Sequence, residues 1–307
     1  MKIAITGGSG FIGRYILRQF LSHGHQLKCW RRTDSKVQDL PAGGPDCQWI
    51  EGNLKTCDTA GDLVQHCHAV IHNAFWRPGS RFQGEEGEIA EFVQTNLVGT
   101  LKLIEAAKKS GVKQFLFVSS CAVHDKILND RRLDENHPLF PSSHYGAHKA
   151  AVEKFVHSYA RSEGFNIGVV RPTGVYGLHH QLSKSKWFEL IRNVMQGKEV
   201  FCGKGGKEVH ANDVAKSMRV LLERDEFQGE VFACYDRYIS EYDVAHLAKE
   251  ISGSDAKING HSIRPKNQID TEKIRGMGMV FGGNELLRKT VNEIVAGIDA
   301  SGEKSSL

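Results

Sequence analysis

The sequence predicts a doubly wound α/β domain, a parallel sheet with helices on both faces, joined to a smaller mixed C-terminal cap. Three observations support this prediction. Short apolar segments alternate with helical patterns through the first half of the chain. These segments are almost continuously apolar, as strands covered on both faces are. A glycine-rich turn follows the first strand, at the edge of the sheet where such domains bind their ligands.

The elements are expected in a regular order along the chain. Strands are expected over residues 2–6, 26–31, 48–51, 69–73, 114–119 and 166–171, because each is a short apolar run bounded by polar or turn-forming residues. Helices are expected over 10–22, 60–66, 89–110 and 143–163, where apolar residues recur at helical spacing. A further strand over 229–234 is expected to return to the sheet.

The pattern changes after Arg171. Helices are expected over 184–196, 211–223, 241–252 and 285–298, separated by glycine-rich and charged stretches. We therefore expect a large first domain over 1–171, to which 211–235 returns, and a smaller cap over 172–210 and 236–300. Residues 301–307 are expected to form a polar tail.

The composition is that of a globular protein. Of 307 residues, 40% are hydrophobic and 25% are charged, which excludes a disordered chain, a coiled-coil rod and a collagen-like repeat. The net charge of +4 comes without a basic block, so no nucleic-acid partner is expected. The seven cysteines are scattered and the N-terminus is strand-like, so we expect a reduced, cytoplasmic protein. The sequence shows no set of metal ligands and no long apolar run, so neither a bound metal nor a membrane segment is expected.

Part of a glycine excess, 32 residues in all, lies in the turn after the first strand. Gly7, Gly10 and Gly13 have the spacing of a dinucleotide-binding loop, flanked by a strand and a helix. Gly7 permits the tight turn, Gly10 lets the backbone approach a pyrophosphate, and Gly13 lets the helix pack closely on the strand. The helix N-terminus then offers free N–H groups to the phosphates.

The end of the second predicted strand indicates which dinucleotide fits. Domains that bind NAD usually carry an acid there for the ribose 2′-hydroxyl. This chain has Arg31 and Arg32 instead, and its first acid is Asp34. Guanidinium groups bind phosphate well, so we expect NADP in preference to NAD. The alternative is that both arginines are ordinary solvated side chains.

Tyr145 and Lys149 are spaced by four residues and therefore share one face of the helix over 143–163. An ammonium near a phenol lowers its pKa and makes it a usable acid–base at neutral pH. Ser120 follows a predicted strand and could hold the oxygen of a substrate. Alone, the Tyr–Lys spacing also fits an interfacial tyrosine beside a solvated lysine.

Together, these motifs resemble those of the extended short-chain dehydrogenases/reductases, the NAD-dependent epimerase/dehydratase family. The resemblance covers nearly the whole chain. It includes residues 7–13 (GGSGFIG), 52–54 (GNL), 71–74 (IHNA), 96–100 (NLVGT), 119–120 (SS), 171–177 (RPTGVYG) and 210–215 (HANDVA). It implies a Rossmann-type fold, a nicotinamide dinucleotide cofactor and a small-molecule substrate.

The resemblance also implies a role for each matching residue. Ser120 would bind the reacting oxygen, Tyr145 would be the acid–base, and Lys149 would tune Tyr145 and hold the ribose. The other implied cofactor-binding residues are Gly10, Phe11 and Ile12 at the pyrophosphate, Asn53 and Leu54 at the adenine, Asn73, Ala74 and Phe75 along the cofactor, and Pro172 at the nicotinamide. Asn96 would have either a functional role in the site or a structural role in its helix.

Departures from the family pattern bear on the reaction. Asn53 replaces the usual acid beside the adenine but still supplies a side-chain acceptor. Dehydratases of the family carry an acidic pair after the active-site hydroxyl, whereas this chain has Cys121 and Ala122, so dehydration is not expected. Gly174 stands where nucleotide-sugar enzymes often have asparagine, and the form of residues 172–174 looks more like the reductase and steroid-dehydrogenase branches.

Four residues are candidates for substrate contact: Trp76, Cys121, Gly174 and His179. Packing or loop roles are the alternatives for Trp76, Cys121 and His179. The cap and the loops over 75–87, 121–142 and 177–185 are expected to determine the substrate.

Three functions fit the sequence. The first is an NADP-dependent oxidoreductase that reduces a carbonyl or oxidises an alcohol. The second is a nucleotide-sugar epimerase that holds and recycles its cofactor. The third is a non-catalytic NADP sensor, which the intact Ser120, Tyr145 and Lys149 disfavour. By resemblance, the helices over 89–110 and 143–163 could form a homodimer interface.

Overall fold

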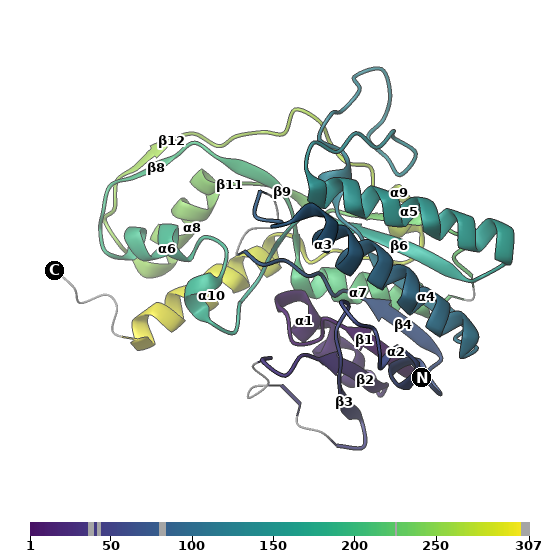
Figure 1. Cartoon of the computed structure of the whole chain (residues 1–307). Helices are drawn as coiled ribbons and strands as arrows, with labels where there is room; N and C mark the ends of the chain where they lie inside the picture. Colours follow the sequence, from purple (N-terminus) through teal and green to yellow (C-terminus); the bar gives the residue numbers. More distant parts are fainter. Residues whose placement is uncertain (36–39, 42–43, 80–83, 225, 302–307) are drawn as a thin grey trace. The chain divides into compact units, whose positions relative to one another are not determined.

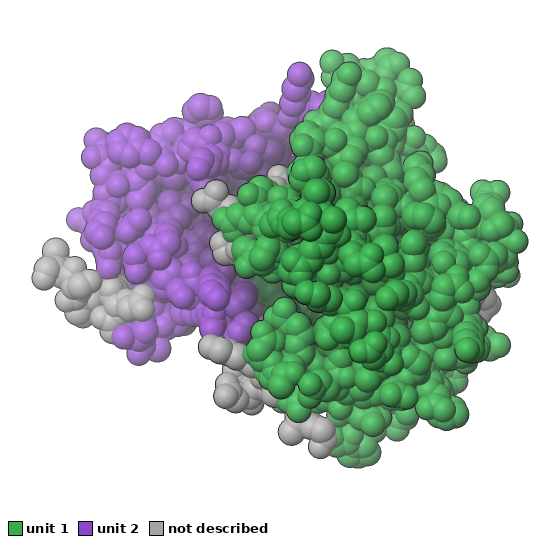
Figure 2. Space-filling model, viewed as in Figure 1, with its two compact units in different colours: residues 1–172, 214–234, 269–279 green, residues 173–213, 235–268, 280–307 purple. Residues whose placement is uncertain are grey.

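The protein is described here by a computed structural model that covers residues 1–35, 40–41, 44–79, 84–224 and 226–301. It contains two compact units, coloured separately in Figure 2. Unit 1 comprises Met1–Pro172, Val214–Cys234 and Ile269–Met279. Unit 2 comprises Thr173–Asp213, Tyr235–Gln268 and Val280–Leu307. Each unit has its own buried apolar cluster.

Unit 1 is built on a parallel sheet (Figure 1). Among the described residues, seven strands have the order β10-β6-β5-β4-β1-β2-β3, and every neighbouring pair is parallel. Their bounds are β1 Lys2–Thr6, β2 Gln26–Arg31, β3 Cys47–Glu51, β4 Ala69–His72, β5 Gln114–Val118, β6 Ile167–Pro172 and β10 Val231–Cys234. The direction of winding changes between β1 and β4, which is where ligands bind in sheets of this kind. The predicted fold class is confirmed.

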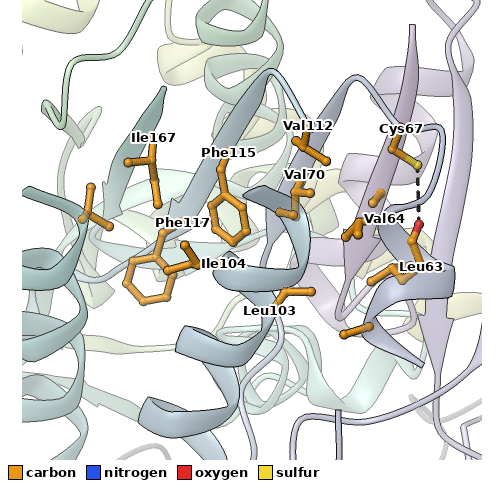
Figure 3. Packing of buried hydrophobic residues seen from close by; sticks show 14 of the residues in the cluster. Leu63, Val64, Cys67, Val70, Leu103, Ile104, Val112, Phe115, Phe117 and Ile167 are labelled. Atoms are coloured by element: carbon orange, nitrogen blue, oxygen red, sulfur yellow. Dashed lines mark hydrogen bonds between the residues drawn. The ribbon is translucent and has the colours of Figure 1, made fainter. Parts of the chain in front are cut away.

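Both faces of this sheet are covered. Phe115 and Phe117 alternate with Leu116 along β5, so the two phenylalanines lie on one face and Leu116 on the other, yet all three are buried. Figure 3 shows the phenylalanine face packed against Leu103 and Ile104 of helix α4 (Gly99–Lys109). Burial on both faces explains why the strands are continuously apolar in sequence.

The helices of unit 1 begin and end at recognisable signals. Helix α5 (His144–Glu163) starts at Ser143, whose hydroxyl accepts a hydrogen bond from the Gly146 N–H, and ends at Gly164 with a φ of +64°. The other helices are α1 (Phe11–Leu21), α2 (Ala60–Val64), α3 (Ile89–Val93), α4, α7 (Ala211–Leu222, which also enters unit 2) and α9 (Glu272–Gly276).

The single helix predicted over 89–110 is interrupted. Between α3 and α4 lies a π-helical turn over Gln94–Val98. Within it, the Asn96 side chain donates to the Phe92 carbonyl oxygen at 3.1 Å, and the Thr100 hydroxyl donates to the Asn96 carbonyl oxygen at 2.5 Å. Side-chain bonds of this kind are invisible to hydrophobic periodicity, which is why the sequence indicated one continuous helix.

Unit 2 is a smaller mixed structure. Strand β9 (Gly205–His210) pairs in parallel with β7 (Gly174–Tyr176) and antiparallel with β11 (Arg237–Ser240). A second pair joins β8 (Val200–Cys202) to β12 (Ile258–Gly260). Helices α6 (Phe188–Met195), α8 (Glu241–Ser252) and α10 (Gly283–Ser301) enclose an apolar cluster with these strands.

One segment expected in the cap belongs to unit 1. Ile269–Met279 joins the large unit because Ile269 forms a bridge to Leu133 and Ile274 of α9 is fully buried. The Lys273 ammonium also donates to the Val231 carbonyl oxygen of β10 at 3.0 Å. These contacts span more than 40 residues along the chain, so no local pattern predicts them.

Two further findings concern the described residues only. None of the helices in the described ranges is both long and apolar enough to cross a membrane. The same ranges contain no group of three or more His, Cys, Asp or Glu side chains that could hold a metal ion.

Helix α4 depends on a close approach at Gly99. A Cβ atom there would lie 2.3 Å from the Leu54 carbonyl oxygen, whereas one at Gly61 in α2 would have no atom within 4 Å. We expect Gly99→Ala to lower the free energy of unfolding by about 1–3 kcal/mol, because backbone must move. The matched change Gly61→Ala should leave it equal or raise it by up to ~1 kcal/mol. Urea denaturation measures both, and equal effects would contradict the packing.

Candidate active site

The turn after β1 forms an open cradle at the N-terminus of α1. Gly7 has a φ of +72°, and a Cβ there would lie 2.8 Å from the Ala74 nitrogen. A Cβ on Gly13 would lie 2.0 Å from the Gly7 carbonyl oxygen, whereas one on Gly10 would meet only that oxygen, at 3.3 Å. The side of Gly10 is therefore open. No acidic residue lies in the first turn of α1 and no side chain caps it, so Phe11 and Ile12 begin a helix whose N-terminus fits a pyrophosphate.

The exit of β4 is tied to this turn. The Asn73 side chain donates to the Gly7 carbonyl oxygen at 3.4 Å, and the Ala74 N–H donates to the Thr6 hydroxyl oxygen at 3.1 Å. These bonds hold Asn73 and Ala74 beside the glycine turn, next to the point where the winding direction changes. A cofactor lying across that point would pass both residues.

The His72 side chain connects β1 to α4 through the hydroxyl groups of two threonines. Its Nδ1 lies 2.7 Å from the Thr6 hydroxyl oxygen, and its Nε2 lies 2.8 Å from the Thr100 hydroxyl oxygen. The Thr100 hydroxyl hydrogen is already donated to Asn96, so Nε2 must donate to Thr100. In the neutral imidazole, Nδ1 then accepts from the Thr6 hydroxyl. Burial agrees with this, since it lowers the pKa of His72 to about 3, and the charge of Lys149 acts in the same direction.

Asn96 is a structural residue. Its side-chain oxygen accepts from the Trp76 N–H at 2.8 Å, and its amide donates to the Trp76 carbonyl oxygen at 2.9 Å. The π-helical turn thus clamps the backbone of the segment that follows β4. Trp76 itself is half-buried, and its position is set by this backbone clamp.

Tyr145 lies near the N-terminus of α5, beside the end of β5. Its phenol shares a hydrogen bond with the Ser120 hydroxyl. The ring of Phe75 packs edge-on against the Tyr145 ring, with centroids 5.0 Å apart. Ser120 also accepts a hydrogen bond from the Ala122 N–H at 3.2 Å, which fixes its side chain at the start of a short helical turn. The structure therefore brings together Ser120, Tyr145 and Phe75.

Lys149 lies one helical turn beyond Tyr145 and is 4% exposed. Its ammonium donates to the Val118 carbonyl oxygen at 2.8 Å and lies over the rings of Phe117, Phe75 and Tyr145 at 4.6, 5.5 and 5.8 Å from their centroids. Burial lowers the pKa of Lys149 to about 7, against the opposing charge of Glu153. Lys149 therefore releases its proton more readily than a solvated lysine does.

The expected lowering of the Tyr145 pKa is not met. Burial raises the pKa of Tyr145, although the hydrogen bond to Ser120 and the charge of Arg77 act in the opposite direction. The expectation placed a full positive charge beside a solvated phenol. In the structure Lys149 is buried and Tyr145 is half-buried, and desolvation disfavours the charged form of each. Tyr145 is accordingly protonated at neutral pH.

A buried ion pair lies below these residues. Glu153 is 1% exposed and Arg171 is 3% exposed. The Arg171 guanidinium donates to both Glu153 carboxylate oxygens, with its Nη2 bond at 2.6 Å and its Nε bonds at 2.9 and 3.2 Å. The Ser119 hydroxyl also donates to Glu153. Arg171 further lies 3.1 Å from the Nε2 of His124, whose pKa burial lowers to about 4.

The ends of β2 and β3 carry the remaining cofactor candidates. Arg31 and Arg32 are both exposed, and the Arg32 guanidinium lies 3.2 Å from the Asp34 carboxylate, a contact open to solvent. The Asn53 side-chain oxygen accepts from the N–H groups of Lys55 at 2.9 Å and Thr56 at 3.1 Å. The oxygen expected to serve the adenine is therefore already used within its own loop, and the role of Asn53 at the adenine stays a prediction. Leu54 is buried in the apolar cluster.

The remaining cofactor and substrate candidates are divided between the two units. In unit 1, the Cys121 thiol donates to the Arg171 carbonyl oxygen at 3.5 Å, and Pro172 pairs with Cys234 at the end of β6. Gly174 and His179 lie in unit 2. A Cβ on Gly174 would lie 2.6 Å from the Glu208 carboxylate. The His179 Nδ1 accepts from the Gln181 N–H at 3.0 Å, and its ring stacks on His180.

A comparison with protein families identifies the family of the chain. The model of the NAD dependent epimerase/dehydratase family matches residues 3–234. The chain belongs to this family. The resemblance drawn from the motifs is thereby confirmed, and the protein is an NAD(P)-dependent enzyme of the epimerase/dehydratase family.

Several curated relatives have names that span the chemistry of this family. A mouse protein named dTDP-D-glucose 4,6-dehydratase is 30% identical over an alignment of 314 positions, which covers 90% of this chain and 83% of the relative. A ketoreductase of Stigmatella aurantiaca is 29% identical over 246 residues, covering 77% of this chain and 68% of the relative. The chain spans 46% and 44% of two trifunctional proteins of Arabidopsis thaliana.

Solved structures give the same fold. A UDP-glucose 4-epimerase of Thermotoga maritima has a TM-score of 0.79 at 22% identity and covers 98% of this chain and 99% of its own. A UDP-glucose 4-epimerase of Thermus thermophilus, solved with NAD, has a TM-score of 0.77 at 22% identity, with coverage of 96% and 99%. At 22% identity, these structures show that the fold is shared.

Sequence reasoning missed three residues that organise the site of this family member: His72, Glu153 and Arg171. His72 lies in the motif over 71–74 and Arg171 in the motif over 171–177, but no neighbouring residue in the sequence indicates which side chains they contact. Glu153 had one usable signal. It lies four residues beyond Lys149 and eight beyond Tyr145, so it belongs to the same buried face of α5.

His72 makes stability depend on pH. Its folded pKa of about 3 lies below the unfolded value of 6.5, so between these limits the unfolded state binds more protons. The free energy of unfolding should therefore be highest above pH 6.5 and should fall on acidification, by up to ~1.4 kcal/mol per pH unit from this one group.

We expect His72→Gln to be less stable at pH 7 and to have a shallower decline between pH 6.5 and 4.5, because glutamine does not titrate. Urea denaturation across this range measures the difference in slope, to which the other histidines contribute equally in both proteins. Parallel curves would show that His72 does not resist protonation.

Proposed function

We propose that the protein is an NADP-dependent oxidoreductase that reduces a carbonyl compound, with Ser120, Tyr145 and Lys149 as its catalytic residues. The observation that carries this proposal is the hydrogen bond between Ser120 and Tyr145, with the buried Lys149 ammonium above the Tyr145 ring. Similarity to a ketoreductase of Stigmatella aurantiaca supports the same class of reaction.

Each residue has a defined task in the proposed reaction. A bound nicotinamide dinucleotide supplies the hydride that adds to the carbonyl carbon. Ser120 donates a hydrogen bond to the carbonyl oxygen and orients it. Tyr145 transfers its phenolic proton to that oxygen as negative charge develops, and regains a proton from solvent. Because burial raises the pKa of Tyr145, the phenol is protonated at neutral pH, which is the form that reduction requires.

The cofactor residues follow from the geometry of the glycine turn. Gly7, Gly10 and Gly13 with Phe11 and Ile12 would bind the pyrophosphate. Asn73, Ala74 and Phe75 would line the cofactor, Pro172 would lie at the nicotinamide, and Lys149 would hold the ribose. Near the adenine, Asn53 would offer only its amide hydrogens, since its oxygen is used in its own loop, and Leu54 would contribute apolar surface.

NADP is proposed over NAD because of Arg31 and Arg32. Both side chains are exposed at the end of β2, where a 2′-phosphate would lie, and the solvent-exposed pair between Arg32 and Asp34 is weak enough to exchange for a phosphate.

The candidates for substrate contact are Trp76 and Cys121 in unit 1, and Gly174 and His179 in unit 2.

A nucleotide-sugar epimerase is the second candidate. A specific observation favours it: a UDP-glucose 4-epimerase of Klebsiella pneumoniae is 36% identical over 133 residues, which cover 40% of this chain and 92% of that protein. Such an enzyme would show turnover without net oxidation of its cofactor. Dehydration is not proposed, because Cys121 and Ala122 follow Ser120 in place of an acidic pair.

We also propose a cytoplasmic homodimer. Its interface would use α3 and α5, where the apolar side chains of Ile89, Val93 and Phe155 are 44%, 39% and 41% exposed. All seven cysteines are free thiols, which fits a reducing compartment.

Tyr145→Phe tests the catalytic assignment. We expect kcat to fall by about 10²–10⁴-fold because the proton donor is lost, while cofactor affinity remains within about twofold. Reduction of a panel of aldehydes, ketones and keto-sugars is followed by loss of reduced cofactor absorbance. Tyr159→Phe is the matched control, since it is the same change on the same helix away from Ser120. Full activity in Tyr145→Phe would refute the assignment.

Cofactor choice is tested at the end of β2. In the double variant Arg31→Ala/Arg32→Ala we expect the Kd for NADP to rise by about 10–100-fold, because hydrogen bonds between charged groups are lost, with little change for NAD. Isothermal titration calorimetry measures both constants. Arg18→Ala is the control, since it removes an exposed arginine of α1. Tighter binding of NAD than of NADP by the unaltered protein would overturn the preference.

A further inference from the structure

Helix α5 presents three polar side chains to one buried side, at intervals of one helical turn: Tyr145, Lys149 and Glu153. The first two have roles in the proposed reaction. Glu153 has none, although it is 1% exposed and therefore lies as deep as Lys149. A carboxylate at that depth needs a physical reason.

The contacts of Glu153 are complete. Both of its oxygens accept from the Arg171 guanidinium, and one also accepts from the Ser119 hydroxyl. A buried ion pair of this kind is seldom more stable than apolar side chains of the same volume, because desolvation offsets the attraction of the two charges. Stability alone therefore does not account for the pair.

Ser119 connects Glu153 to the reacting groups. It stands between Val118, whose carbonyl oxygen accepts from Lys149 at 2.8 Å, and Ser120, whose hydroxyl bonds to Tyr145. The end of β5 thus contacts α5 at three successive residues, through Lys149, Glu153 and Tyr145. Glu153 is the central contact, and it fixes the distance between the segment after β5 that carries Ser120 and the helix that carries Tyr145.

Glu153 also acts on the charge of Lys149. The titratable groups that face Lys149 are Tyr145, His148 and Glu153 of its own helix and His72 of β4. Burial lowers the pKa of His72 and of His148, so both rings are neutral, and Tyr145 is protonated. Among these groups, only the Glu153 carboxylate opposes the loss of the Lys149 proton, which burial brings down to about pKa 7.

We propose that Glu153 is a positioning residue of this active site, whose carboxylate preserves the charge of Lys149 and, through Ser119, holds Ser120 against Tyr145. This inference rests on the proposed function for its catalytic consequence, but the effect on Lys149 exists without turnover. Arg171 is the counter-ion that holds the carboxylate in place.

The experiment follows the Lys149 ammonium directly. Protein labelled with ¹³C at lysine Cε is titrated by NMR, and the Lys149 signal is assigned by its absence in Lys149→Arg. We expect a midpoint near pH 7 in the unaltered protein and a midpoint lower by about one pH unit or more in Glu153→Gln, because the opposing charge is lost. Ser119→Ala keeps the ion pair, so its midpoint should be unchanged while kcat falls.

Glu153→Gln leaves Arg171 buried without its carboxylate, which lowers the stability of the fold, so Glu153→Gln/Arg171→Met is prepared beside it. This double variant has no unpaired buried ion, and the Lys149 midpoint should again be lower than in the unaltered protein, by less than in Glu153→Gln because the positive charge of Arg171 is lost as well. An unchanged midpoint in these variants overturns the inference, whether or not the protein reduces carbonyl compounds. A shifted midpoint in a protein with no reductase activity on the substrate panel supports the charge role and refutes the proposed function instead.

In active protein, the pH profile of kcat/KM separates positioning from general destabilisation. We expect the limb that reports deprotonation of Lys149 to move to lower pH in Glu153→Gln by the same interval as the NMR midpoint. A lower kcat with an unmoved limb would assign Glu153 a purely structural role and overturn the inference.

Discussion

The site depends on one close approach between two backbone segments. Gly7 has no side chain, so the chain leaving β4 can pass within contact distance of the turn that leaves β1. This approach brings Ala74 to the hydroxyl of Thr6 and Asn73 to the Gly7 carbonyl oxygen. Because the path of the next residue is then fixed, Phe75 lies against Tyr145. A side chain at position 7 would separate the phosphate turn from the groups around the phenol.

Desolvation governs the chemistry of the groups behind this turn. His72, Lys149 and Glu153 are all buried, and the structure compensates each of them differently. His72 stays neutral between two hydroxyls, Lys149 is held by a carbonyl oxygen and aromatic faces, and Glu153 is paired with Arg171. Burial lowers the pKa of His72 and of Lys149, and it keeps Tyr145 as a proton donor by raising the pKa of its phenol.

The large unit could be predicted well from sequence because its signals are local. β1 and β2 have the predicted bounds, since each is a short, mainly apolar run with polar residues at both ends. The cap strands were not predicted. β7, β8 and β12 have three residues each, too few for a periodic pattern. Of the site, the glycine turn and the Tyr145–Lys149 spacing could be found in sequence. The pairing of Glu153 with Arg171 could not, because it depends on α5 lying against β6.

The clamp between Asn96 and the backbone of Trp76 has an evolutionary consequence. It divides the segment after β4 into a part whose path is fixed by hydrogen bonds and a part beyond it that carries no such constraint from Asn96. The clamp holds the backbone of Trp76, and with it Phe75, by bonds from Asn96, whereas Arg77 beyond it acts on Tyr145 through its charge. A change of substrate that leaves Asn96 and Arg77 in place can therefore keep Phe75 packed against the proton donor.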